Sequence, residues 1–115
     1  MGLGNAKPSW AGPAIGGAVE KNFTTTGSSV LIMSANNSRL GYLIQNPVST
    51  DLNPSGNSIF VRLGAAATDD QGDSFEVTPG GYFPLPGLPL FRGDVYVIGP
   101  SGGSAVKCPA VEFTQ

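Results

Sequence analysis

Few residues of this chain could carry out chemistry. Its 115 residues include no histidine and a single cysteine, Cys108. A cysteine or serine acts as a nucleophile only where a neighbouring base or an electropositive setting activates it. Because histidine is missing, we expect Cys108 to be a small buried side chain of the core. One cysteine also excludes an internal disulfide and a cysteine-based zinc site.

Acidic residues gather once, between Asp69 and Glu76. Clustered carboxylates on a glycine-containing loop can bind calcium. However, Asp69, Asp70 and Asp73 lie at offsets 0, 1 and 4, which is not EF-hand spacing, and we interpret the segment as a solvated turn. The carboxylates that a glycosidase could use are scattered along the chain: Glu20, Glu76, Asp94 and Glu112. The sequence therefore predicts no enzyme, no cofactor and no bound metal.

The charge balance argues against nucleic acids and membranes as partners. Six basic and eight acidic residues give a net charge of −2, whereas nucleic-acid-binding proteins carry a basic patch or stripe. The cations are isolated in the sequence: Lys7, Lys21, Arg39, Arg62, Arg92 and Lys107. No apolar run reaches the about 18 residues of a membrane span. The N-terminus lacks the pattern of a secretory signal, so we expect synthesis in a cytoplasm.

The composition is typical of a small, turn-rich β domain. Charged residues make up 12% of the chain, about half of the usual share of roughly 25%, while glycine and proline are abundant. From residue 22 onward, short β-rich runs alternate with turn residues, a pattern of sandwiches and barrels. We predict strands within seven segments: 22–26, 29–33, 40–45, 58–64, 75–77, 94–98 and 105–113.

These segments predict an all-β domain over residues 22–115, an antiparallel two-sheet sandwich of jelly-roll or Greek-key type. An immunoglobulin-like sandwich is the alternative. Alternation places Ile59, Val61 and Leu63 on one face of their strand, and Phe75 and Val77 inward. The proline-rich stretch Phe83–Pro89 is expected to be an extended edge or a loop, without an assigned role.

Residues 1–21 differ from the rest, because their glycines and prolines cannot sustain a helix or a ladder. A disordered tail is one interpretation. We favour an extended N-terminal arm that lies on another surface, with the only tryptophan as its anchor. The residues predicted to bind the partner are Leu3, Pro8, Trp10, Ile15 and Val19.

Three strands are apolar on both faces: Val30–Met33, Tyr42–Ile44 and Val95–Ile98. A strand with one solvated face alternates, so apolar residues on both faces indicate that both are covered. One small sandwich cannot cover both faces of its own sheets. We therefore expect a homo-oligomer, either a trimer or a dimer.

Three motifs carry a resemblance to a known class: Arg39-Leu-Gly-Tyr-Leu-Ile-Gln-Asn46, Ile59-Phe-Val-Arg-Leu-Gly64 and Phe75-Glu-Val-Thr-Pro-Gly80. Together with Asp94–Ile98 and a last strand ending at Phe113, residues 37–113 resemble small β-sandwich virion proteins of tailed bacteriophages. The resemblance implies a head decoration or cement protein, or the capsid-attached base of a head fibre. Such proteins bind the major capsid protein on the virion, after synthesis in the host cytoplasm.

A second hypothesis is a receptor- or glycan-binding module of a phage fibre or tail. It requires aromatic side chains that line an exposed cleft. Four residues of this chain are candidates: Tyr42, Tyr82, Phe83 and Phe91.

Overall fold

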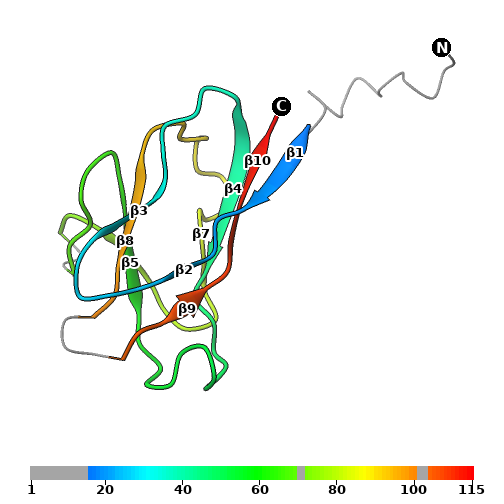
Figure 1. Cartoon of the computed structure of the whole chain (residues 1–115). Helices are drawn as coiled ribbons and strands as arrows, with labels where there is room; N and C mark the ends of the chain where they lie inside the picture. Colours follow the sequence, from blue (N-terminus) through cyan, green and yellow to red (C-terminus); the bar gives the residue numbers. More distant parts are fainter. Residues whose placement is uncertain (1–15, 70–71, 101–103) are drawn as a thin grey trace, which may run out of the picture.

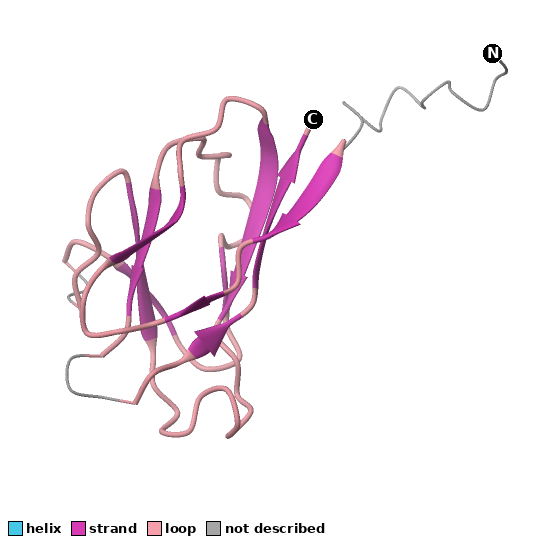
Figure 2. Ribbon diagram, in the orientation of Figure 1, coloured by secondary structure: helices cyan, strands magenta, loops and turns pink. Residues whose placement is uncertain are grey.

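The chain folds into antiparallel β-sheets (Figures 1 and 2). The computed structural model describes residues 16–69, 72–100 and 104–115. Within these ranges the strands are β1 (Gly17–Glu20), β2 (Phe23–Thr24), β3 (Val30–Met33), β4 (Arg39–Gln45), β5 (Ile59–Leu63), β6 (Phe75–Val77), β7 (Tyr82–Phe83), β8 (Val95–Ile98), β9 (Lys107–Cys108) and β10 (Ala110–Thr114). The prediction of an all-β antiparallel domain is confirmed.

Two four-stranded sheets face each other in a sandwich-like arrangement. The first sheet has the order β1-β10-β4-β7, the second sheet has the order β3-β8-β5-β6, and β2 pairs with β9 in a small third sheet. Figure 1 shows the two large sheets as separate layers. The core between them is made of buried side chains from both layers: Met33, Tyr42, Ile44, Ile59, Val61, Val77, Phe83, Val95, Val97, Val106, Cys108 and Ala110.

The local sequence explains where the strands begin and end. In β5, Ile59 and Val61 are buried while Phe60 and Arg62 are half-buried, which confirms the predicted alternation. After β6, the Gly81 N–H donates to the Thr78 carbonyl at 2.8 Å. Gly80 lies inside this turn with φ at +86°, a conformation that glycine adopts without a steric cost. Pro79 and Gly80 therefore reverse the chain between β6 and β7.

The loop after β4 is held by buried asparagines. The Asn46 amide donates to the carbonyls of Asn57 at 2.9 Å and Val77 at 2.8 Å. The Asn53 amide donates to the Asn46 side-chain oxygen at 3.0 Å. Both asparagines are buried, and their hydrogen bonds replace the water that they lose on folding. This small network closes the end of the sandwich below β5 and β6.

Residues 17–20, which the prediction assigns to the N-terminal arm, form a strand of the domain. β1 and β2 run beside β10 and β9 in one register, in which Gly17 lies opposite Thr114 and Phe23 lies opposite Cys108. Residues 17–20 therefore belong to the first sheet, and the domain begins at least five residues before the predicted boundary. An edge strand needs hydrogen bonds on one side only, so a short Gly-Ala-Val-Glu run without alternation can pair.

Phe75 lies on the inner face, as predicted, but its side chain is not buried. Phe75 pairs with Val61 and so shares its face, but its side chain is 55% exposed while Val77 is buried. β6 is a three-residue edge strand, and the opposing sheet does not cover its first residue. The Phe75 ring instead contacts Phe83, with ring centroids 5.5 Å apart. The proline-rich stretch is a loop after β7, as predicted.

Candidate interaction surfaces

The outer face of the first sheet carries little charge. We define this face by the outward residues of β1, β10 and β4: Ala18, Glu20, Gly41, Leu43, Val111 and Phe113. The registers place them in two rows, one through Phe113 and one through Val111. Leu43 is 41% exposed. The Phe113 ring lies over Gly41, and a Cβ added to this glycine would be 3.8 Å from the ring. Glu20 is the one charged member of the face.

A shallow groove runs along this face beside β10. It has a volume of about 290 Å³ and is lined by Glu20, Asn22, Leu43, Gln45, Pro109, Ala110 and Val111. Most of its wall is apolar, so water gains little by filling it. The groove is a recess in the outer face into which an apolar side chain of a partner can pack.

The outer face of the second sheet carries one residue of each charge among its apolar residues. Its two rows follow the pairing of β3, β8, β5 and β6, and they contain Leu31, Tyr96, Arg62, Ile98, Phe60 and Glu76. Leu31 is 45% exposed. Arg62 uses one nitrogen to donate to the Ala66 carbonyl at 3.3 Å. Leu31 and Leu43 are thus exposed on the two sheets of a single copy, and their cover by other subunits stays a prediction.

An aromatic cavity opens between the sheets where β7 meets the proline-rich loop. Its volume is about 230 Å³, and it is lined by Tyr42, Leu63, Phe75, Phe83, Pro84, Leu88, Pro89, Leu90 and Phe91. Three of the four aromatic residues predicted for a cleft line it, and Tyr82 does not. The Tyr42 phenol is the polar side-chain group of this wall. Burial raises the pKa of Tyr42, against a smaller opposing effect of the nearby Arg39 charge.

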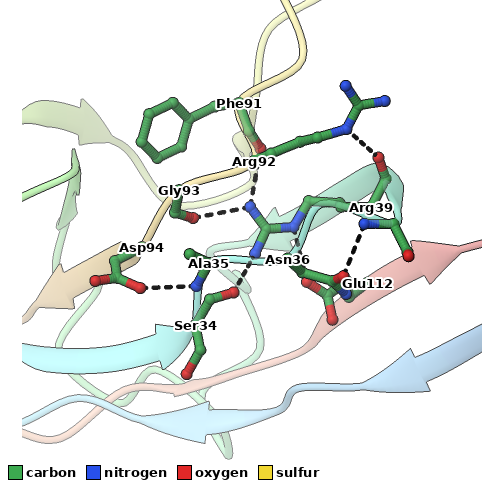
Figure 3. Close-up of polar contacts among 10 residues, drawn as sticks. Ser34, Ala35, Asn36, Arg39, Phe91, Arg92, Gly93, Asp94 and Glu112 are labelled. Carbon is green, nitrogen blue, oxygen red and sulfur yellow. Dashed lines mark hydrogen bonds and ion pairs between the residues drawn. The ribbon is translucent and has the colours of Figure 1, made fainter.

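Arg39 and Glu112 form a buried ion pair between β4 and β10 (Figure 3). The Arg39 Nε–H donates to Glu112 Oε2 at 2.7 Å. The other guanidinium nitrogens donate to the carbonyls of Phe91 at 2.8 Å, Gly93 at 2.9 Å and Ser34 at 2.8 Å. Arg39 has no solvent exposure. One guanidinium thus joins the end of β3, the loop before β8 and the last strand.

The residues with catalytic or metal-binding potential do not converge. Among the described residues, no three of His, Cys, Asp and Glu lie close enough to hold a metal ion. Glu20, Glu76 and Glu112 lie on three different strands, and an Asp94 oxygen accepts the Ala35 N–H at 2.7 Å. The acidic segment Asp69–Glu76 is only partly within the described ranges, which omit Asp70 and Gln71.

Cys108 is a core residue, which confirms its prediction. Its side chain is buried, and burial raises the pKa of the thiol to about 12. A thiol with such a pKa remains protonated at neutral pH and is a poor nucleophile. Within the described chain, no helix is long and apolar enough to span a membrane.

Four of the five predicted partner-binding residues, Leu3, Pro8, Trp10 and Ile15, lie outside the described residues. The fifth, Val19, lies on β1 and is 46% exposed. Neither the Arg39–Glu112 pair nor the outward positions of Val111 and Phe113 were predicted from the sequence. The alternation Val111-Glu112-Phe113 was a signal that these residues differ in face.

Comparisons with known proteins add no assignment. The chain matches no protein-family model, no curated protein and no solved structure.

Proposed function

We propose that this chain is a non-enzymatic structural protein of a phage virion that self-assembles and binds the outside of the capsid. It acts as a decoration or cement protein, and its partner is the major capsid protein. The observation that carries this proposal is the low charge of the outer face of the first sheet, where Leu43 is exposed at the surface of a single copy.

The chemistry of the outer face of the first sheet favours permanent assembly over free solution. Long-lived protein interfaces are more apolar than ordinary surfaces, and charged residues are depleted at their centres. The outer face of the first sheet has this composition over three adjacent strands, and its groove offers a recess for a partner's side chain. Burial of apolar surface supplies about 25 cal/mol per Å², so two such faces can support a stable complex.

The strand order also supports the proposal. We propose that the fold is a jelly roll, in which eight principal strands form two four-stranded sheets with the orders β1-β10-β4-β7 and β3-β8-β5-β6. Jelly rolls occur in viral capsid proteins and in lectins. Since one fold hosts many functions, this point agrees with both functional hypotheses and the surfaces decide between them.

The aromatic cavity is the observation that favours the second hypothesis, a receptor- or glycan-binding module of a fibre or tail. Tyr42, Phe83 and Phe91 converge there, as a sugar-binding cleft would require. Sugars, however, need several hydrogen-bonding groups around them, because each unpaired hydroxyl loses its water. The Tyr42 phenol supplies one. The cavity is thus better suited to an apolar side chain than to a glycan.

Co-sedimentation with capsid shells tests the proposal. The full chain is mixed with shells of the phage that encodes it, and bound copies are counted per shell after centrifugation. We expect saturation at a fixed copy number, and a loss of at least tenfold in affinity for Leu43→Lys on the outer face. Val48→Lys is the control, because Val48 is 70% exposed in a loop outside the sheets, and it should bind normally.

Two results would contradict the proposal. One is a chain that stays in the supernatant at every concentration. The other is equal binding by Leu43→Lys and the unmodified chain. A glycan array that gives specific hits, lost on Phe91→Ala, would instead support the second hypothesis.

A further inference from the structure

The four edges of the two large sheets are not equally protected against pairing. Natural proteins guard exposed edge strands with proline, charge or a bulge. β7 has two residues and is followed directly by Pro84, β6 has three residues, and β3 has a register shift around Ile32 where it meets β8, and very short edge strands are themselves a protection. β1 has four residues and carries Glu20, but it contains no proline and pairs with β10 without a register shift. Among the described residues, no strand lies on its other side.

The backbone of β1 presents hydrogen-bonding groups to this free edge. The Lys21 N–H donates to the Ala110 carbonyl, and the Thr25 N–H donates to the Val106 carbonyl, both at 2.8 Å. In an antiparallel ladder, alternate residues direct their N–H and C=O groups to the same neighbour. Gly17, Val19 and Lys21 therefore face β10. The N–H and C=O groups of Ala18 and Glu20 point away from the sheet, towards the free edge.

One side chain of β1 is also left incompletely packed. Val19 lies opposite Glu112 of β10 and so on the inner face of the first sheet. It is nevertheless 46% exposed, because β1 is the outermost strand. A neighbouring strand at the free edge would cover it.

We infer that β1 pairs with β1 of a second copy of this chain, antiparallel and about a twofold axis beside Val19. In this register Ala18 lies opposite the partner's Glu20, and each such pair exchanges two backbone hydrogen bonds. Val19 meets the partner's Val19 as a non-hydrogen-bonded pair, the closer type of cross-strand contact. The two first sheets become one eight-stranded sheet.

A second copy fits this edge because β1 is complementary to itself. In the register centred on Val19, Glu20 lies beside Ala18 and Lys21 lies beside Gly17, so neither charge meets its own copy. A register centred on Ala18 would place Val19 opposite glycine and would leave its apolar surface unused. A twofold contact of one strand with itself is closed and gives a dimer.

This inference rests on the self-association part of the proposed function and gives it a surface. Joining the first sheets at β1 places their two low-charge outer faces side by side. The dimer would then present one extended apolar surface to the capsid, twice as wide as that of a single copy.

Disulfide trapping tests the contact. Residues in a non-hydrogen-bonded antiparallel pair have Cα atoms about 4.5 Å apart, within the range of about 4.4–6.8 Å that a disulfide bridges. Oxidation of Val19→Cys should therefore link most of the chain into a covalent dimer, seen on a non-reducing gel. Val48→Cys is the matched control, since Val48 is also a valine and is 70% exposed in a loop outside the sheets. The native Cys108 is buried and does not compete.

Light scattering of the unmodified full chain gives the second readout. We expect the mass of two copies, and at least a tenfold rise in the dimer dissociation constant for Val19→Lys but not for Val48→Lys. A mass of one or three copies would overturn the inference, as would a Val19→Cys chain that links no better than Val48→Cys. A monomer that still binds capsid shells would refute this contact alone, whereas a dimer that ignores shells would refute the proposed function alone.

Discussion

Replacing Arg39 by methionine tests the packing between β4 and β10 most directly. Arg39→Met keeps an unbranched apolar stem but removes every hydrogen-bond donor of the guanidinium. Glu112, which is 5% exposed, then loses the cation whose Nε lies 2.7 Å from its Oε2 (Figure 3). The carbonyls of Ser34, Phe91 and Gly93 lose their donor as well.

The expected loss of stability is large. Removing one partner of a buried ion pair costs about 3–5 kcal/mol, because the other charge is left uncompensated. The three carbonyls belong to loops and to the end of β3, where water can replace the guanidinium, so we take the ion-pair cost as the magnitude. A domain of this size has a free energy of unfolding of about 5–15 kcal/mol. Arg39→Met should therefore remove a substantial part of it.

Urea denaturation of the full chain measures the effect. With a urea dependence of about 1–3 kcal/mol per M, the unfolding midpoint should fall by at least about 1 M. The double variant Arg39→Met with Glu112→Leu should be more stable than Arg39→Met alone, since no charge remains buried. Arg62→Met is the control: the Arg62 guanidinium makes a surface hydrogen bond of 3.3 Å, and the free energy of unfolding of this variant should stay within about 0.5 kcal/mol of that of the unmodified chain.

The reasoning would be refuted by an Arg39→Met midpoint equal to that of the unmodified chain. It would also be refuted if the losses caused by Arg39→Met and Glu112→Leu simply added in the double variant. Additivity would mean that the two side chains act independently, in spite of the short contact between them.

Three further predictions follow from the structure. Burial raises the pKa of Cys108 in the folded chain to about 12, so as pH rises above 9 the unfolded chain loses the thiol proton first. The unfolding temperature should therefore fall between pH 9 and pH 12, and Cys108→Ala should reduce this fall. Asn46→Asp should lower the free energy of unfolding by about 1–3 kcal/mol or more, measured in urea, because the amide that donates to Asn57 and Val77 is replaced by an acceptor; unchanged stability would exclude this role. Deletion of residues 1–15 should leave the unfolding midpoint unchanged but weaken binding to capsid shells, and unaltered occupancy would contradict the predicted arm.

The sequence alone predicted most of the fold, because strands and turns have local signals. The alternation in Ile59–Leu63 and the Pro79-Gly80 turn depend on neighbouring residues, and both are confirmed. The failures depend on position within the sheet. Phe75 alternates correctly but lies at an uncovered edge. Residues 17–20 form β1 through hydrogen bonds to β10, almost a hundred residues away, and no local pattern announces such a contact.

The buried ion pair was out of reach for the same reason. Arg39 and Glu112 are 73 residues apart, and each alone is more often a surface residue. The alternation Val111-Glu112-Phe113 on its own predicts that the carboxylate faces solvent and that the two apolar side chains lie in the core. The structure has the reverse arrangement, because Arg39 supplies a partner for the carboxylate inside the domain.

This reversal connects the ion pair to the outer face of the first sheet. A slip of β10 by one residue would turn Val111 and Phe113 into the core and Glu112 towards solvent, because strand side chains alternate between faces. On hydrophobic grounds the slipped sheet would be the ordinary one. The slipped sheet would, however, leave the buried Arg39 charge without its carboxylate partner, at a cost of several kcal/mol. The ion pair thus adds little net stability compared with an apolar core, but it selects the register in which the apolar residues of β10 face outward. In an isolated domain the outward Val111 and Phe113 lose apolar contacts, whereas a partner that covers the outer face of the first sheet would restore them.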